Sequence, residues 1–466
     1  MPEDQQLEHE PDSSSDSGSR RAPDAISAVS ESEQLREFYG DRVSIVTPET
    51  YEELADVVRS ACEEKRTVIP TGGGHHAHVG VPPEGDVLAV SMRNLNRVLR
   101  YEPDDFTLGV QSGMPLSDLR RVLSENRQEI PVDVSSSYAG TVGGWIAIGF
   151  PGPRQSKQGL LRNYLIGTHG LRARLTPELY KTGGMVVKNV AGYDVGKFLI
   201  GSLGTAGFLL EANFKLCPLP ARRSLRFAMF GHRREAGQFV QALRRKGLEP
   251  AILQVLGGRA AAHLSRRVHS LDAEGHWLLW AFEGNDSQVT WQERELDRLL
   301  LEHAPSEVPK ADDVDAANTM DFLSEFVEPS PLVAELDTPP NELGVVRIGV
   351  LPGQAREVEQ AIHDQLENKC QSFATLVDAL AGMLTVRWQR REGTVGDVVE
   401  FFRHVTTQYN GKGALIYLPR AERVKHPYYQ LAPAPSASLA ASVRRVFDSH
   451  DLFYPGRILA HTPTTK

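Results

Sequence analysis

The sequence has few cysteines: 3 among 466 residues, at Cys62, Cys217 and Cys370. They lie far apart and none belongs to a CxxC pair, so the chain cannot by itself hold a four-cysteine iron–sulfur cluster or a zinc ribbon. Few and scattered cysteines fit a reducing cytoplasm.

Long apolar runs are also missing, and none approaches the roughly 20 residues that a membrane-spanning helix needs. The first residues are acidic and polar, so we expect no secretory signal. Lys and Arg total 51 against 60 for Asp and Glu, a net charge of −9, which does not favour a nucleic-acid binder. Hydrophobic residues make up 41% and charged residues 24%, values typical of a soluble globular protein. The length predicts two or three domains.

Glycine, by contrast, is concentrated in three turns. TGGGHHAHVG at 71–80 follows a predicted strand at 67–70, and SSSYAGTVGGWIA lies at 135–147. GSLGTAGF at 201–208 leads into an alternating strand. Backbone N–H groups converging in such turns solvate a pyrophosphate well, because no Cβ blocks the approach. The pattern is not a P-loop, since no GK[ST] follows, and each turn alone could be a plain turn. Together they predict one extended, phosphate-bearing ligand.

In this order, the three segments resemble the flavin-binding domain of the PCMH-type, vanillyl-alcohol-oxidase-type FAD flavoproteins. Residues 151–220 resemble the FAD-binding subunit (E subunit) of bacterial glycolate oxidase. The resemblance rests on GPRQSKQGLLRNYLIGT (152–168), MVVKNVAGYDVGKFLIGSLGTAGFLLE (185–211) and the ending DLFYPGRI (451–458).

This resemblance implies an α+β fold in which a two-subdomain PCMH-type FAD-binding domain carries a cap domain. Residues 1–34 would form a disordered tail, since 1–30 are mostly Ser, Asp, Glu and Gln. Residues 35–221 would form the FAD-binding domain. Residues 222–430 would form a cap with a helix-covered antiparallel sheet, where two successive strand–helix passes read as ferredoxin-like. Residues 431–466 would supply a helix (437–449) and a segment returning to the FAD-binding domain.

The resemblance also names the residues that would hold the FAD. The first segment would bring its backbone to the phosphates, the second would add the Thr141 hydroxyl, the third would lie beside the isoalloxazine, and the last would hold the adenine end. In chain order these residues are Thr71, Gly72, Gly73, Gly74, His75 and Gly80, then Asp133, Thr141, Gly143, Gly144 and Ala147, then Asn189, Gly192 and Asp194, then Gly204, Thr205 and Phe208. The family usually has a β-branched aliphatic residue where Phe208 stands.

His75 has three interpretations. With His76 and His78 it could form a metal site, but no carboxylate or cysteine partner is evident. In covalent members of the superfamily, a histidine at this place is bonded to the flavin ring. We favour the third interpretation, in which only the backbone N–H of His75 contacts phosphate, and we predict no metal site.

The implied reaction is oxidation of a small 2-hydroxy acid, such as glycolate or lactate, with an arginine for the carboxylate and a histidine base. Cap strand ends offer Arg387, Arg390 and Arg420, but the His-rich GHxGDGNxH segment of the D-type glycolate oxidase subunits is missing. We therefore assign no catalytic residue from the sequence.

The chain would be a subunit that passes electrons from FAD to partners, namely an iron–sulfur subunit and a second flavin subunit. Two alternatives stay open: a stand-alone FAD oxidase with a His75-linked flavin, and a non-catalytic assembly subunit. A murein-precursor NADPH reductase is disfavoured by KNVAGYD. We expect a cytoplasmic location, with membrane association only through partners.

Overall fold

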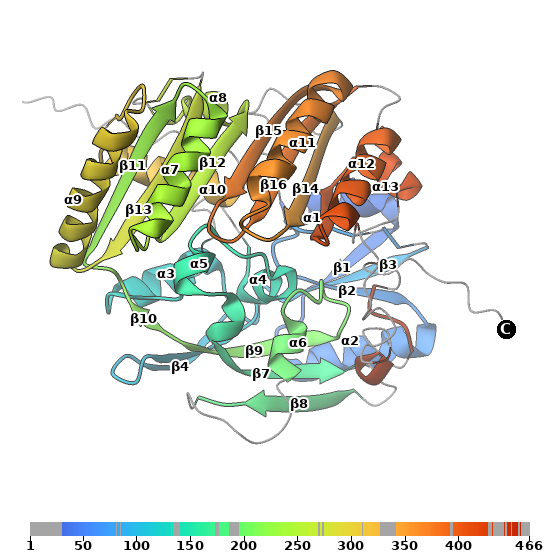
Figure 1. Cartoon of the computed structure of the whole chain (residues 1–466). Helices are drawn as coiled ribbons and strands as arrows, with labels where there is room; N and C mark the ends of the chain where they lie inside the picture. The colour runs from blue at the N-terminus through green and yellow to red at the C-terminus, as the bar shows by residue number, and fades with distance from the viewer. Residues whose placement is uncertain are drawn as a thin grey trace, which may run out of the picture.

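The computed structural model describes residues 30–80, 82–83, 85–131, 133, 140–172, 177–185, 195–268, 271–272, 275–309, 311–326, 342–391, 395–426, 431, 442, 445–448, 450–454 and 457. The KNVAGYD segment lies outside them, as does most of the predicted helix over 437–449. The chain folds into two stacked parts, with a large helix-covered sheet above an N-terminal part that contains the smaller sheets (Figure 1).

The N-terminal part begins with a small parallel sheet in the order β1-β3-β2, formed by β1 (Val43–Val46), β3 (Val87–Ser91) and β2 (Thr67–Thr71). Helix α1 (Glu31–Tyr39) precedes it, so the last four residues of the predicted tail are helical. Helix α2 (Tyr51–Glu64) connects β1 to β2 and buries Leu54, Val58 and Ala61 at helical spacing.

Helix α2 does not begin at Thr47-Pro48, although Thr followed by Pro is a common helix start. Its N-cap is Thr50, whose hydroxyl accepts a hydrogen bond from the N–H of Glu53 at 3.1 Å. The helix starts at Thr50 because Thr50 satisfies a backbone donor of the first turn.

A five-stranded antiparallel sheet forms the rest of the N-terminal part, in the order β4-β5-β9-β7-β8. The strands are β4 (Val98–Glu102), β5 (Thr107–Gln111), β9 (Phe208–Lys215), β7 (Leu165–Arg172) and β8 (Glu178–Gly183). The predicted alternation after the last glycine turn is confirmed in β9, where Phe208, Leu210, Ala212 and Phe214 are buried. Smaller elements complete this part: α3 (Leu116–Ser124), β6 (Gln128–Glu129), α4 (Val142–Ile148), α5 (Gln155–Gln158), α6 (Val195–Leu199) and β10 (Cys217–Pro218).

The upper part, called the cap below, contains one seven-stranded sheet in the order β11-β13-β12-β15-β16-β14-β17, and every neighbouring pair is antiparallel. The strands are β11 (Arg222–Phe230), β12 (Ile252–Gly258), β13 (His276–Gly284), β14 (Leu343–Gly349), β15 (Cys370–Asp378), β16 (Met383–Arg390) and β17 (Lys412–Tyr417). The second half runs β14-α11-β15-β16-α12-β17, and the first half has the same order without a fourth strand. These are the two ferredoxin-like passes that the sequence predicted, joined along β12 and β15.

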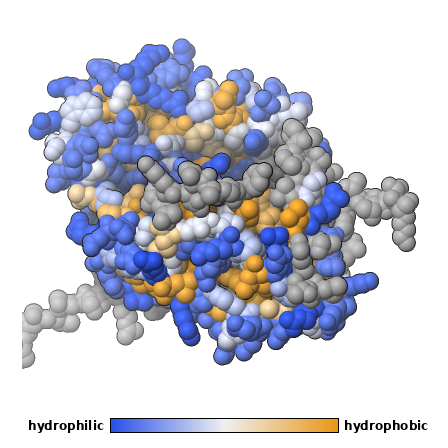
Figure 2. Space-filling view, turned by 90° about the horizontal axis from the view of Figure 1, so that it is seen from below, coloured by the Kyte–Doolittle hydropathy of each residue, from blue (hydrophilic) through white to orange (hydrophobic). Residues whose placement is uncertain are grey.

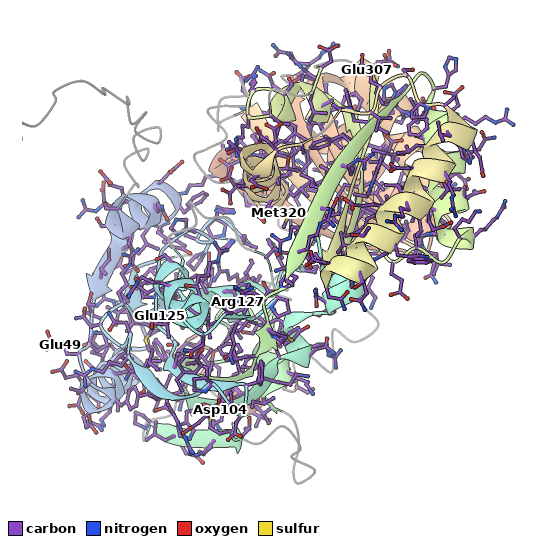
Figure 3. The ribbon with its side chains drawn as sticks, turned by 90° about the vertical axis from the view of Figure 1, so that its left-hand side faces the viewer. Glu49, Asp104, Glu125, Arg127, Glu307 and Met320 are labelled. Atoms are coloured by element: carbon purple, nitrogen blue, oxygen red, sulfur yellow. The ribbon has the colours of Figure 1, made fainter. Side chains whose placement is uncertain are left out.

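Long helices cover the outer face of the cap sheet, namely α7 (Arg233–Arg245), α9 (Asp286–His303), α11 (Ala355–Lys369) and α12 (Val395–Gln408). Helix α10 (Asp313–Glu325), which the sequence did not predict, packs on the opposite, inner face through Phe322 and Leu323. Figure 3 shows Met320 of this helix near the N-terminal part and Glu307 at the far end of the cap. Short helices α8 (Ala260–Leu264) and α13 (Arg420–Lys425) complete the cap.

Buried ion pairs join the two parts. Arg154, after α4, contacts Asp133 at 2.7 Å and Glu129 at 3.0 Å in its own part, and Glu283 of β13 at 3.4 Å. Arg223 of β11 contacts Glu283 at 2.5 Å. Glu283 of β13 is therefore fastened to the N-terminal part by a charge-assisted contact, and Arg223 holds the same carboxylate within the cap.

The outer surface is mostly polar. Seen from below, hydrophilic side chains cover most of the rim and hydrophobic side chains form separate patches between them (Figure 2). Among the helices of the described residues, none is both long and apolar enough to span a bilayer.

Candidate cofactor site

A cavity in the N-terminal part is lined by residues of all three glycine turns that the sequence analysis singled out. Its wall includes the turn after β2 (Gly72 to Gly74), the turn that opens α4, and the turn from Ser202 to Gly204 before β9. Apolar side chains such as Ile69 and Ile146 line the space between the turns. The fold thus brings together three segments that lie more than 60 residues apart in sequence.

Two of these turns touch so closely that only glycine fits. A Cβ atom on Gly72 would lie 2.1 Å from the hydroxyl oxygen of Thr141. Thr141 is itself the N-cap of α4, and its hydroxyl accepts a hydrogen bond from the N–H of Gly144 at 3.3 Å. Gly74 adopts a φ of +76°, a conformation that side chains other than glycine rarely take. Backbone atoms rather than side chains therefore form this wall.

Of the predicted residues, ten line the cavity and four described ones do not. Those that line it are Thr71, Gly72, Gly73, Gly74, His75, Thr141, Gly143, Gly144, Ala147 and Gly204. Asn189, Gly192 and Asp194 lie outside the described residues.

The four predicted residues that do not line the cavity have other contacts. The carboxylate of Asp133 pairs with Arg154, and the hydroxyl of Thr205 donates to the carbonyl of Ser202 at 2.7 Å. Phe208 is fully buried, with its ring centroid 5.3 Å from that of Phe453. Gly80 lies against Arg457, whose Cγ would be 2.5 Å from a Cβ at this position.

Sequence reasoning missed several lining residues, of which Arg457 matters most. It comes from the DLFYPGRI ending, which was noted only as part of the resemblance. Tyr39 and Ser112 were also missed because nothing in their local sequence marks them, and Ser202 was missed although it lies in the GSLGTAGF turn.

The cavity carries positive charge. No Asp or Glu is among its described lining residues, and Arg457 contributes a guanidinium. Burial lowers the pKa of His75 to about 4, with the charge of Arg93 adding to the effect. Burial, followed by His75 and Arg457, lowers the pKa of His76 to about 3. Both imidazoles are therefore neutral at pH 7.

The three histidines of the first turn do not gather around one point suited to a metal. The rings of His76 and His78 lie 6.1 Å apart, and His78 packs against Tyr417 of the cap at 5.4 Å. Within the described residues, no group of three or more His, Cys, Asp or Glu side chains could hold a metal ion.

Comparison with known proteins identifies the ligand. The sequence pattern of the FAD binding domain family matches residues 44–174, which include the first two glycine turns. The chain carries a PCMH-type FAD-binding domain. Its cofactor is FAD, as the resemblance predicted, and FAD is an extended, phosphate-bearing ligand of the kind that the glycine turns predicted.

Relatives of this FAD-binding domain include both kinds of glycolate oxidase subunit. The chain is 29% identical over 213 residues to glycolate oxidase subunit GlcD of Bacillus subtilis, covering 46% of this chain and 45% of that protein. It is 31% identical over 175 residues to glycolate oxidase subunit GlcE of Escherichia coli, covering 37% and 49%. The chain thus aligns with less than half the length of these curated relatives.

The solved structure of an alkyldihydroxyacetonephosphate synthase shares the fold. It superposes with a TM-score of 0.62 at 17% sequence identity, covering 88% of this chain and 75% of that one. The cap is included in an overlap this wide, so the whole two-part architecture is shared. The predicted α+β fold with a helix-covered antiparallel cap sheet is confirmed.

The residues of the cavity fit FAD. The pyrophosphate is a compact dianion, and a glycine-built wall without carboxylates and with one guanidinium suits it. The apolar lining between the turns suits flat ring systems, which bury mostly apolar surface. When bound, FAD supplies a two-electron acceptor that the side chains of this protein do not provide.

Proposed function

We propose that the chain is an FAD-dependent oxidoreductase, or the FAD-binding subunit of one, that acts on a small 2-hydroxy acid such as glycolate or lactate. The observation that carries this proposal is a pair of buried arginines, Arg347 and Arg387, on the inner face of the cap, of which Arg347 adjoins the FAD cavity through Phe150. The division into a tail (1–34), FAD-binding domain (35–221), cap (222–430) and returning segment (431–466) is part of the same proposal.

Arg347 lies next to the cavity wall through Phe150. Its guanidinium lies 5.3 Å from the centre of the Phe150 ring and donates to the carbonyl of Pro151 at 3.4 Å. Phe150 in turn contacts His76, with ring centroids 6.0 Å apart, and His76 lines the cavity. One aromatic ring thus separates Arg347 from the histidine that lines the FAD cavity.

Arg387 shares the inner face with Arg347 on the neighbouring strand. Arg347 is opposite Thr385 and Arg387 is opposite Val345, so the two arginines are diagonal neighbours. Cα atoms in such pairs are roughly 7–8 Å apart. This spacing allows both guanidinium groups to reach one small anion.

Among the described residues, no carboxylate forms an ion pair with Arg387; the nearby Glu325 acts on its charge but pairs with Arg267. Its Nη1 lies 3.5 Å from the carbonyls of Glu325 and Phe326, while Nε and Nη2 donate to no acceptor within the described residues. Burial lowers its pKa to about 9, which still leaves it protonated at pH 7. A buried cation of this kind favours a carboxylate ligand, and planar guanidinium groups bind carboxylates in two-point fashion. Of the arginines proposed from the sequence, Arg390 pairs with Glu422 and Arg420 lies at the start of α13.

The roles proposed for this chain are binding and orientation. The glycine turns would hold FAD, the arginine pair would hold the substrate carboxylate, and the packing of the cap on the N-terminal part would exclude water. No proton acceptor is assigned to a histidine of this chain. Because relatives of the chain include subunits of glycolate oxidase, we propose that electrons leave for partners, an iron–sulfur subunit and a second flavin subunit, in a cytoplasmic complex.

An anaerobic titration tests this function. The FAD-loaded chain is mixed with glycolate, D-lactate or L-lactate, alone and with its co-purified partners, while the visible absorbance of oxidised flavin is recorded. Reduction by a 2-hydroxy acid supports the proposal, and reduction only with partners assigns the chain a subunit role. Rapid reoxidation by oxygen without partners would favour the stand-alone oxidase. No reduction by any 2-hydroxy acid, with partners present, would leave an assembly subunit and contradict the proposal.

A further inference from the structure

Among the described residues of the C-terminal segment, Arg457 is the one that lines the FAD cavity. The described residues Asp448, 450–454 and Arg457 are called the strap here. Arg457 lines the cavity, is 5% exposed and belongs to a segment that lies about 250 residues from the last glycine turn. It is thus a buried charge supplied by the far end of the chain.

The guanidinium of Arg457 donates to three backbone carbonyls in the glycine-turn region. Nε donates to Val79 at 2.9 Å, and Nη2 to His76 at 2.6 Å, both in the segment after the first turn. Nη1 donates to Leu203 at 2.5 Å, directly before Gly204. One side chain therefore fixes the first and last glycine turns relative to each other.

These partners are neutral, so they satisfy hydrogen bonds without neutralising charge. Within the described residues, no carboxylate forms an ion pair with Arg457. The ring of Tyr454 lies 4.3 Å from the guanidinium carbon and offers only a cation–π contact. A buried charge without a counter-ion is costly, and the cost is offset when an anion binds beside it. The anion that this cavity receives is the FAD pyrophosphate.

Gly80 gains an explanation from the same geometry. A Cβ at this position would lie 2.5 Å from Cγ and 2.6 Å from the carbonyl oxygen of Arg457. Gly80 does not line the cavity, and its lack of a side chain is what lets Arg457 reach the carbonyls.

The strap contacts β2, the strand of the parallel sheet that ends at the first glycine turn. Val68 of β2 donates to the carbonyl of Leu452 at 2.9 Å and accepts from the N–H of Tyr454 at 3.2 Å. The hydroxyl of Tyr454 lies 3.0 Å from that of Tyr39, which donates to the carbonyl of Ala77. The strap therefore contacts β2 through its backbone and the glycine turns through Arg457, so its docking links the two.

We propose that Arg457 is a positioning residue that supplies the counter-charge of the FAD pyrophosphate and makes docking of the strap depend on bound cofactor. The inference rests on FAD as the cofactor and does not require any particular substrate. By linkage, FAD tightens the strap by the same factor by which the docked strap tightens FAD.

Ligand binding to the apo chain tests the proposal. We would measure the Kd of FAD, ADP and adenosine for the wild type, Arg457→Met, Arg457→Lys and the control Arg59→Met, whose arginine pairs with Asp56 on the surface of α2. Loss of a charged contact predicts that Arg457→Met weakens FAD and ADP by about 10–100-fold. The Kd of adenosine, which lacks the pyrophosphate, should change by less than about threefold in Arg457→Met. The Arg457→Lys variant should retain part of the affinity for FAD and ADP.

Two results would overturn the proposal: unchanged FAD affinity in Arg457→Met, or equal weakening of ADP and adenosine, which marks a purely structural role. Amide hydrogen exchange of the wild type provides a second readout that does not depend on the variants folding. The amides of Leu452 to Tyr454 should exchange more slowly with FAD than without it, and equal rates would contradict the coupling. A wild type that binds no FAD would instead contradict the cofactor assignment itself.

Discussion

A Cβ atom on Gly72 would stand 2.1 Å from Oγ1 of Thr141, although 69 positions separate the two residues in sequence. This contact fixes the first glycine turn against the start of α4 and shapes the wall of the FAD cavity. The same hydroxyl caps α4, so a side chain at position 72 would displace the group that caps this helix.

Substitution of Gly72 by alanine should therefore abolish tight FAD binding while leaving most of the fold intact. The added methyl would push Thr141 away and move the turn, so we expect at least a tenfold increase in the Kd of FAD. The control is Gly353→Ala, since a Cβ there meets nothing within 4 Å. Fluorescence titration of the apo variants with FAD measures both, and equal affinities would show that the contact does not shape the site.

Arg154→Met should destabilise the protein by about 3–5 kcal/mol, because it strands buried carboxylates at the boundary between the two parts. Burial alone would lower the pKa of Arg154, but Asp133 and Glu283 outweigh it and raise that pKa. Urea unfolding measures the loss, with Arg100→Met as control because its partner Glu102 is on the surface. A loss no larger than that of the control would show that the network contributes nothing.

The ion pairs of Glu283 with Arg154 and Arg223 also make the stability of the protein depend on pH in the acid range. Burial tends to raise the pKa of Glu283, but Arg154 and Arg223 outweigh it and hold the pKa below the usual 4.5. A depressed folded-state pKa means that this stability is fully present above about pH 4.5 and is lost as the pH falls through the lower folded value. Thermal melts from pH 6 to pH 3 should show a smaller acid-induced loss in Glu283→Gln than in the wild type. An identical pH dependence would contradict this assignment.

The buried histidines predict a second pH window. The pKa values of His75 and His76 fall from 6.5 to about 4 and about 3, so both stay neutral in the folded state while they would protonate in the unfolded chain. Their contribution to stability is complete above pH 6.5 and decreases as the pH falls toward 4. The melting temperature of His76→Asn should depend less on pH between 7 and 5 than that of the wild type. His404→Asn, an exposed substitution on α12, is the control for the change of side chain.

Removal of the guanidinium of Arg387 should weaken the binding of substrate rather than the binding of FAD. In Arg387→Met, we expect the Kd of a 2-hydroxy acid, or of a small dicarboxylate probe such as oxalate, to rise by about 10–100-fold. FAD affinity should stay within about threefold, because Arg387 does not line the FAD cavity. The matched control is Arg420→Met on α13. Flavin absorbance changes on ligand addition report both, and unchanged oxalate binding would remove Arg387 from the substrate site.

The features of the fold that were predicted correctly from the sequence are those that short stretches of residues specify. The glycine turns, the alternation in β9 and the two strand–helix passes of the cap were visible because each is specified within about 10–40 residues. The roles of Arg457 and Tyr39 in lining the cavity were not visible in the sequence, because they arise from contacts between segments that are distant in the chain. Asp133 illustrates the opposite case: the family resemblance suggested a ligand contact, whereas its carboxylate pairs with Arg154. Helix α10 escaped because its polar sequence has a weak apolar face, and its burial arises from packing on the inner face of the cap sheet.

The central claim is that the cavity between the glycine turns holds FAD, and one preparation tests it most directly. We would purify the chain, record its visible spectrum, reconstitute it with FAD if it is colourless, and then precipitate it with acid. The account predicts a flavin spectrum, with the yellow colour released to the supernatant, because neutral His75 only shares the cavity with the cofactor. Colour retained in the pellet would indicate a His75-linked flavin. A colourless chain that takes up no FAD would contradict the account.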